Sequence, residues 1–177
     1  GDCVTQGIAD LCCALSDDLS PCYVVYYDTE QESYSPLRPC SNIRHEVGMG
    51  FWVWSWGKER LDARLRTPLK PTRIALKKGW NQVGSPFDYP VSLDAIAVIK
   101  GNQQEGLGSA HSKGWIGKYL FLYDTDIGEY QGLPLTGGVL EPWKGYWIRA
   151  YEDCELLIPN TLASPSATKV LVDEGKL

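Results

Sequence analysis

Apolar and aromatic residues occur in short runs separated by polar turns, and this pattern predicts strands along most of the chain. Runs of this kind lie at 22–27, 51–56, 73–76, 80–84, 118–123 and 146–150. β-Branched and aromatic residues bounded by Asp, Gly and Pro are typical of strands in hairpins. Two segments carry helical spacing instead, 8–16 and 92–99, and we expect a short helix in each, the second capped by Ser92. The polar segment 101–108 predicts a loop.

One pattern of residues occurs twice. Three blocks match in the same order at a separation of 95 or 96 residues, namely 27–34 with 123–130, 46–53 with 141–148, and 72–79 with 168–175. Three blocks at nearly one spacing indicate an internal duplication. We therefore expect a mostly β fold of two similar hairpin-rich units, sandwich-like or barrel-like, that pack face to face. The strands at 46–56 and 141–151 should be followed by hairpin partners at 60–65 and 155–158.

The boundaries of the two copies do not coincide with the ends of the chain. We expect residues 1–71 to form a truncated first repeat with a cysteine-rich N-terminal segment, and 72–165 to form a complete second repeat. Residues 166–177 resemble the opening strand of the second repeat, so we expect them to complete the first. The residues of this assembly strand are Lys169, Val170, Leu171 and Val172. Two alternatives stay open: pairing within the chain, which closes a domain, and pairing with a neighbouring molecule, which builds a polymer.

Alternation assigns the two faces of the repeated strand. One face is apolar or small in both copies, as a packed interior requires: Phe51, Val53 and Ser55, matched by Tyr146, Ile148 and Ala150. The other face carries Trp52, Trp54 and Trp56, matched by Trp147, Arg149 and Tyr151. A position that holds Trp in one copy and Arg in the other predicts a surface. We expect most of the Trp and Tyr residues, including Trp52, Trp80 and Trp147, to lie in the core or anchor hairpins. The residues expected to dock a second protein or stack on sugar rings are Trp54, Trp56, Arg149 and Tyr151.

Composition and charge narrow the classes of function. The chain has 177 residues, of which 44% are hydrophobic and 22% charged, as in an ordinary globular protein. The net charge is −5 and the basic residues are scattered, which argues against nucleic acid as a partner. The longest apolar runs fall far short of the roughly 20 residues that a membrane-spanning helix needs. We expect no membrane span.

The cysteines indicate an oxidising compartment, and hence an extracellular or cell-surface location. There are six, Cys3, Cys12, Cys13, Cys22, Cys40 and Cys154. Zinc is the alternative use, but no pair has the C-x-x-C spacing of a zinc site, so we favour disulfides. Six cysteines allow 15 pairings, and the connectivity stays open.

Signals for catalysis and for metals are weak. His45 and His111 lie in dissimilar contexts and no nucleophile, metalloprotease or phosphate-loop motif occurs, so we expect no enzymatic activity and no cofactor. Asp124 and Asp126 resemble the start of a calcium loop, without its third acidic ligand or its distant glutamate. A hairpin turn explains the same residues, because Asp and Gly favour turns.

Two motifs of the second copy carry a resemblance. Residues 79–86 read G-W-N-Q-V-G-S-P and residues 143–148 read W-K-G-Y-W-I. Together they resemble a module common in secreted and cell-surface prokaryotic proteins, with the pattern G-W-N-[LIV]-[VI]-G-x-P, a hairpin, and then [PK]-G-[KR]-G-Y-W-[VI]. The resemblance covers about 75–158, and the first copy only from Tyr23 onward, without the G-W-N segment; Gln82 stands where an aliphatic residue is usual. It implies an extracellular β module and no catalytic residues.

These observations favour a non-enzymatic extracellular structural or assembly protein. Its partners would be other copies of itself or another surface protein, and exchange of its C-terminal strand would form fibres. One alternative is a carbohydrate-binding module that binds a glycan on the Trp and Tyr face. Another is an accessory domain of a larger surface protein.

Overall fold

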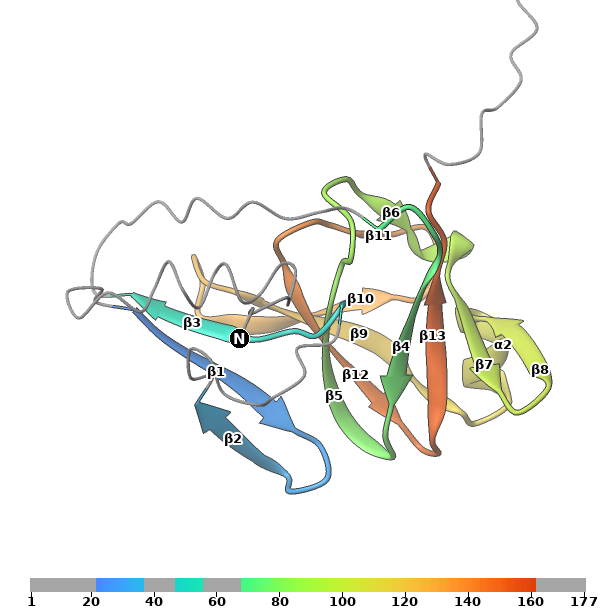
Figure 1. Cartoon of the computed structure of the whole chain (residues 1–177), viewed down its shortest axis with the longest axis horizontal. Coiled ribbons are helices and arrows are strands. Elements are labelled where there is room, and N and C mark those ends of the chain that lie inside the picture. The colour runs from blue at the N-terminus through green and yellow to red at the C-terminus, as the bar shows by residue number, and fades with distance from the viewer. Residues whose placement is uncertain (1–21, 37–46, 56–67, 162–177) are drawn as a thin grey trace, which may run out of the picture.

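The computed structural model describes residues 22–36, 47–55 and 68–161, which form antiparallel sheets and one short α-helix (Figure 1). This part of the chain is mostly β, which confirms the predicted fold class. Several predictions lie outside the described residues. They concern the helix at 8–16, the strand at 60–65, the C-terminal strand with Lys169, Val170, Leu171 and Val172, the cysteines Cys3, Cys12, Cys13 and Cys40, and the side chains of Cys22 and Ser55.

Residues 72–158 form two four-stranded sheets and a two-stranded ribbon. Their elements are β4 (Thr72–Leu76), β5 (Gly79–Gly84), β6 (Val91–Ser92), the 3-10 turn η1 (Leu93–Ala95), β7 (Ala97–Lys100), β8 (Gln103–Gly106), α2 (Leu107–Ser112), β9 (Ile116–Asp124), β10 (Glu129–Pro134), β11 (Val139–Leu140), β12 (Gly145–Ala150) and β13 (Cys154–Ile158). One sheet has the strand order β10-β9-β12-β5 and the other β4-β13-β7-β8, while β6 pairs with β11. We call this part the second unit.

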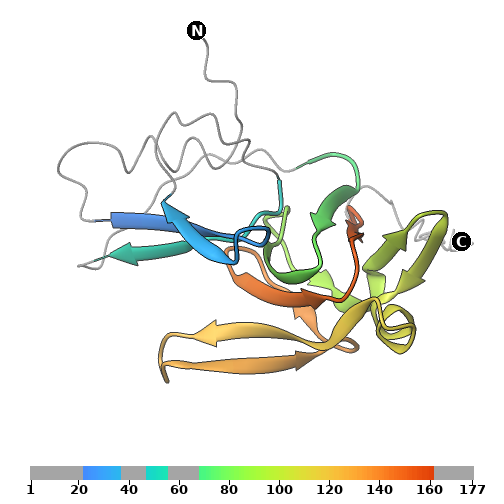
Figure 2. The same cartoon turned by 90° about the horizontal axis from the view of Figure 1, so that it is seen from below.

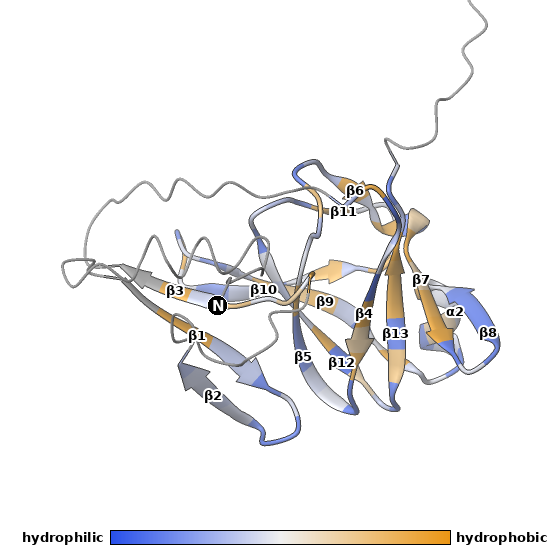
Figure 3. Ribbon diagram, in the orientation of Figure 1, coloured by the Kyte–Doolittle hydropathy of each residue, from blue (hydrophilic) through white to orange (hydrophobic). Residues whose placement is uncertain are grey.

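The hydrophobic core lies between the two four-stranded sheets. Along β12 the buried residues are Tyr146, Ile148 and Ala150, on the face that alternation assigns to the interior. Along β13 every second residue is buried, and β7 and β13 are the strongly hydrophobic strands of the opposite sheet (Figure 3). The interior predicted for residues 146–150 is therefore confirmed.

Residues 22–55 contribute a three-stranded sheet, the first unit, with β1 (Cys22–Asp28), β2 (Ser33–Pro36) and β3 (Trp52–Ser55). Its order, β2-β1-β3, is the order of β10-β9-β12 in the second unit. The register agrees as well. Tyr27 pairs with Tyr34 as Tyr123 pairs with Tyr130, and Val24 pairs with Val53 as Leu120 pairs with Ile148. The two sheets therefore share strand order and register where the sequence blocks match.

The first unit lies over the β9–β10 hairpin of the second (Figure 2). β5 connects the two units, because it is hydrogen-bonded on both sides. β12 pairs with it along one edge. At the other edge, the Gly50 N–H donates to the Gln82 carbonyl at 3.0 Å, and the Gly84 N–H donates to the Gly48 carbonyl at 2.7 Å. The Thr29 hydroxyl adds a bond to the Trp80 carbonyl at 2.8 Å.

Two predictions for the segment 92–108 are wrong. Ser92 does cap a turn, since its hydroxyl accepts a hydrogen bond from the Asp94 N–H, but this 3-10 turn ends at Ala95. Residues 97–100 form β7, because pairing with β13 and β8 overrides the helical spacing. The predicted loop at 101–108 contains β8 and the start of α2.

The hairpin partner predicted for β12 is also wrong. β13, which spans 154–158, pairs with β4 and β7 in the opposite sheet. The alternating burial of β13 places Leu156 and Ile158 in the core. The chain therefore crosses from one sheet to the other after Ala150 instead of returning beside β12.

Val53 does not lie in a packed interior. Its side chain is 38% exposed, whereas the matched Ile148 is 0% exposed and Val24, on the same face as Val53, is 6% exposed. In the described part of the chain, no second sheet covers β3 as β4-β13-β7-β8 covers β12. The prediction is therefore wrong for Val53, because its covering layer differs.

Cys154 corrects the prediction of disulfides at one position. It is a free thiol, 7% exposed, within the core cluster at the start of β13. Burial, and secondarily the nearby Asp153, raises the pKa of the thiol to about 11. A buried neutral thiol packs as a small apolar side chain, so this cysteine contributes to the core without a disulfide.

Candidate functional site

Six aromatic rings form the contact between the two units, and we call them the aromatic contact: Tyr27, Tyr34, Trp52, Tyr123, Tyr130 and Trp147. Trp147 meets Tyr27 and Tyr34 edge-on, with ring centroids 4.9 and 6.3 Å apart. Trp52 meets Tyr123 and Tyr130 in the same way, at 5.2 and 6.5 Å. Each Trp thus lies against the two Tyr of the opposite sheet, and matched residues take matched places.

The aromatic contact is stabilised within each sheet as well as between the sheets. The Tyr27 and Tyr34 rings lie 5.3 Å apart, and the matched Tyr123 and Tyr130 rings lie 5.1 Å apart. Edge-to-face pairs contribute about 0.5–1.5 kcal/mol each beyond the area they bury. Burial, and secondarily the charge of Glu32, raises the pKa of Tyr27, so its phenol is neutral at physiological pH. The contact is therefore apolar and uncharged.

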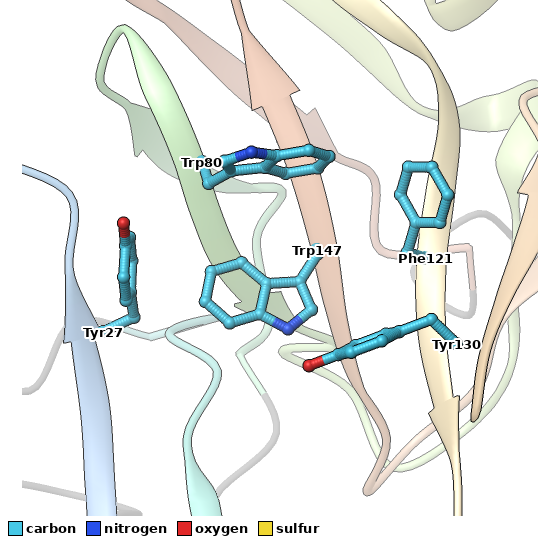
Figure 4. Close-up of a pocket in the computed structure, with 5 residues that line it drawn as sticks. All are labelled: Tyr27, Trp80, Phe121, Tyr130 and Trp147. Carbon is cyan, nitrogen blue, oxygen red and sulfur yellow. The ribbon is translucent and has the colours of Figure 1, made fainter. Parts of the chain in front are cut away.

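An open aromatic groove lies beside this contact, with a volume of about 420 Å³ (Figure 4). Its lining residues are Tyr27, Trp80, Phe121, Tyr130 and Trp147. Tyr27 comes from the first unit and the others from β5, β9, β10 and β12, so neither unit forms the groove alone. Figure 4 shows the five side chains arranged around one space. Tyr130 is 51% exposed, which leaves the groove accessible from solvent.

Two of the four predicted binding residues lie next to the groove. The Arg149 guanidinium is 5.5 Å from the ring of Trp80 and 5.9 Å from the ring of Tyr151. Arg149 and Tyr151 are both exposed. The side chain of Trp54 and the whole of Trp56 lie outside the described residues. The structure therefore brings Arg149 and Tyr151 together with Trp80, which was expected in the core or as a hairpin anchor.

In the first copy of the repeated Tyr-Asp-Thr sequence, each of the three residues has a distinct role. The Tyr belongs to the aromatic contact. The carboxylate of Asp28 accepts hydrogen bonds from the Glu30 and Gln31 N–H groups at 3.0 and 3.1 Å, which closes the β1–β2 turn. Thr29 binds the backbone of β5. Sequence reasoning missed Thr29, although the repeat of Tyr-Asp-Thr is a signal for it.

The candidate calcium residues are part of the matching turn. The Asp124 carboxylate accepts a hydrogen bond from the Asp126 N–H at 2.9 Å and another from the Gln131 side chain at 3.0 Å. These bonds fit the hairpin-turn interpretation. Within 22–36, 47–55 and 68–161, no group of three His, Cys, Asp or Glu side chains is placed to hold a metal ion. His111 is half-buried, with its Nδ1 3.2 Å from the Ile116 carbonyl oxygen.

The G-W-N motif builds the β4–β5 hairpin. Asn81 is only 6% exposed. Its side-chain oxygen accepts a hydrogen bond from the Lys77 N–H at 2.9 Å, and its side-chain nitrogen donates to the Lys77 carbonyl at 2.7 Å. Gly79 has φ of 127°, which a residue with a side chain rarely adopts, and Trp80 then reaches the groove. The motif therefore fixes the turn and places Trp80.

No family model, no curated protein and no solved structure matches this chain. No helix among the described residues is long and apolar enough to cross a membrane.

Proposed function

We propose that this chain is a non-enzymatic extracellular structural protein that assembles with other copies of itself or with another surface protein. The observation that carries this proposal is the reciprocal form of the aromatic contact. Trp147 lies against Tyr27 and Tyr34, and the matched Trp52 lies against the matched Tyr123 and Tyr130. Reciprocal contacts between like patches are the kind that link identical subunits. A unit that binds its own kind within a chain is suited to do so between chains.

Exposed aromatic side chains at the edges of the contact support the proposal. Tyr34 is 52% exposed, Tyr130 51% and Tyr119 38%. Large aromatic residues are enriched where proteins bind one another. The Tyr34 and Tyr130 rings extend the aromatic contact toward solvent, while the Tyr119 ring lies 6.2 Å from that of Phe121 in the groove, and all three offer apolar area to a partner.

The extracellular location is supported by the motifs at 79–86 and 143–148, which resemble those of secreted modules. The cysteines other than Cys154 support it as well, since cysteine-rich segments are common where disulfides persist. Cys154 itself adds no support, because it is a free thiol.

Sedimentation velocity over a range of protein concentrations tests assembly. We expect species larger than the monomer, with a population that rises with concentration. The same measurement on a chain that lacks Thr168–Leu177 tests whether the C-terminal strand is exchanged, and we expect this variant to be monomeric. Removal of only Lys176 and Leu177 is the matched control and should leave assembly unchanged. A monomer at all concentrations contradicts the proposal, and unchanged assembly of the longer deletion contradicts strand exchange.

A second candidate function is glycan binding in the aromatic groove. The observation that favours it is the Arg149–Trp80 stack beside a groove lined by five aromatic side chains. Aromatic faces stack on the apolar faces of sugar rings, and an adjacent guanidinium can donate hydrogen bonds to hydroxyls. Calorimetry against a panel of glycans tests this function. We expect Trp80→Ala to abolish binding and Trp143→Ala, outside the groove, to retain it; no binding across the panel would count against this candidate.

A further inference from the structure

Among the described residues, the first unit has no counterpart of β5. Three elements hold β5 in place: β12, residues 48–50 and Thr29. Each has a match in the other half of the repeat, namely β3, residues 143–145 and Thr125. In the first unit, however, β3 is the edge of a three-stranded sheet, and no strand of the described part pairs with its outer edge. An unpaired strand edge is a template for a further strand.

The three matched elements surround one cleft. This cleft has a volume of about 420 Å³, and residues from all three elements line it: Phe51 and Trp52 at β3, Trp143 to Gly145, and Thr125. Two of its lining residues, Trp52 and Gln82, each carry a buried polar atom, Nε1 and Oε1 respectively, without a hydrogen-bond partner in the described part of the chain. Buried polar atoms usually have partners, so these two atoms are exceptions among the lining residues.

The backbone beside the cleft repeats the backbone that binds β5. Gly48 has φ of 89°, and the matched Trp143 has φ of 63°. A large side chain with positive φ is uncommon, because the Cβ crowds the backbone. The left-handed turn before β12 therefore persists although its sequence does not favour it. Residues 143–145 therefore keep the backbone conformation with which residues 48–50 pair with β5.

The matched glycines two positions further along, Gly50 and Gly145, give stronger evidence. A Cβ placed on Gly50 would lie 2.7 Å from the Gln82 Cγ and 2.9 Å from the Val83 nitrogen, so β5 approaches Gly50 too closely for any side chain. A Cβ placed on the matched Gly145 would have no neighbour closer than 3.9 Å, the distance to the Phe51 carbonyl oxygen. Nothing in the described unit therefore requires a glycine at 145, whereas a strand in the cleft would.

We infer that the cleft between β3 and residues 143–145 is the acceptor site for an extended strand of the G-W-N-x-V-G type, supplied by another molecule. The inference rests on the proposed assembly function and names the surface and the partner segment. The incoming backbone would pair with β3 on one side and with 143–145 on the other, and the Thr125 hydroxyl would donate to its carbonyl as Thr29 does to Trp80. Strand addition of this kind takes its affinity from main-chain hydrogen bonds.

The occupant differs from the C-terminal segment of the chain. Residues 168–175 match β4, whereas the cleft corresponds to β5. Beside β5, a Cβ on Gly48 would lie 2.2 Å from the Cδ1 of Ile74 in β4. The C-terminal segment therefore corresponds to the strand next to the cleft, and not to the strand that would fill the cleft.

A peptide with the sequence of residues 77–86, KKGWNQVGSP, is the direct probe. Fluorescence anisotropy of the labelled peptide against the full chain should show saturable binding. Gly145→Ala should weaken binding at least tenfold, because its Cβ would meet the strand backbone as a Cβ on Gly50 would meet β5. Thr125→Val should weaken binding about two- to tenfold through the lost hydrogen bond. A peptide with proline in place of its valine should not bind, because a donor is lost.

The outcomes separate this inference from the proposed function. Thermal unfolding of Gly145→Ala should match that of the wild type, which shows that lost binding is not lost folding. An unbound peptide, or equal binding to the Gly145→Ala variant, overturns the inference even where sedimentation shows assembly. Peptide binding that Gly145→Ala abolishes upholds the inference, and if the chain nevertheless stays monomeric, only the proposed function is contradicted.

Discussion

The two units share a strand order and a register, but they do not share a core. Val53 and Ile148 occupy matched positions, and their exposed fractions are 38% and 0%. The difference lies in what covers them, since the β4-β13-β7-β8 sheet packs over β12 and has no described counterpart over β3. The same alternation of residues thus produces an interior in one unit and a partly exposed face in the other. The first unit contacts the second through its opposite face, which carries the aromatic contact. Residues 48–50 also pair with β5.

The largest expected effect tests the difference in burial directly. Ile148→Ala removes a fully buried side chain and should lower the free energy of unfolding by about 2–5 kcal/mol. Val53→Ala, on an exposed side chain, should lower it by less than about 1 kcal/mol. Urea unfolding of both variants is the measurement. Equal losses would show that Val53 is as well covered as Ile148.

The second effect is a pH dependence that Cys154 gives to the core of the second unit. The pKa of Cys154 is raised from 9.0 to about 11, first by burial and then by Asp153. Above pH 9 the unfolded chain loses this proton while the folded chain keeps it, so stability is present below pH 9 and is lost as the pH rises through 11. The slope is about 1.4 kcal/mol per pH unit, or about 2–3 kcal/mol in total. Urea unfolding at pH 8 and 10.5 should show a smaller loss for Cys154→Ala than for the wild type.

The third effect compares the two matched glycines. Gly50→Ala forces a Cβ against the backbone of β5 and should cost about 1–3 kcal/mol of stability. Gly145→Ala adds a Cβ in ordinary contact distance of its neighbours and should cost little. Thermal unfolding of the two variants measures the difference. A costly Gly145→Ala would mean that its surroundings are already closely packed.

The fourth effect compares the two matched threonines. Thr29→Val removes the hydrogen bond to the Trp80 carbonyl and should cost about 0.5–1.5 kcal/mol. Thr125→Val should leave the stability of the isolated chain almost unchanged, because Thr125 is exposed. Chemical unfolding of both variants is the check, and similar losses would contradict the role assigned to Thr29.

The smallest effect concerns Trp143. Its left-handed backbone costs about 1–2 kcal/mol, and glycine relieves this cost while adding about 0.5–1 kcal/mol of chain entropy to be lost on folding. Since the side chain is 68% exposed, Trp143→Gly should stabilise the chain by about 0.5 kcal/mol. A shift in the urea midpoint with an unchanged slope would confirm it. A destabilised variant would mean that the indole packs more closely than its exposure indicates.

Local patterns predicted some turns and strand faces well. The turn at Asp124 and Asp126 and the inward face of residues 146–150 agree with the structure. Each of these features depends on neighbours in sequence, either through Asp and Gly turn chemistry or through alternation along one strand. Such signals are contained in a few consecutive residues.

Features that depend on distant packing were not predictable in the same way. β13 does not form the hairpin predicted with β12. It pairs with β4 and β7, and its alternating apolar residues are buried in the core. The groove joins Tyr27, Trp80 and Trp147 from three separate strands, and no local pattern relates them. Only the match between the sequence blocks gave long-range information, by relating the residues of the aromatic contact. It could not show that the two sheets would place these residues against one another.

The aromatic contact has a consequence for the order in which the chain folds during synthesis. Residues 22–55 leave the ribosome before the second unit does, yet the aromatic surface on which they dock includes Trp147. N-terminal segments usually fold before the rest of the protein has been made. Here the first unit cannot complete the aromatic contact until nearly a hundred further residues have emerged. Its Tyr and Trp side chains stay uncovered until then. During this interval a chaperone or a neighbouring nascent chain can bind these side chains.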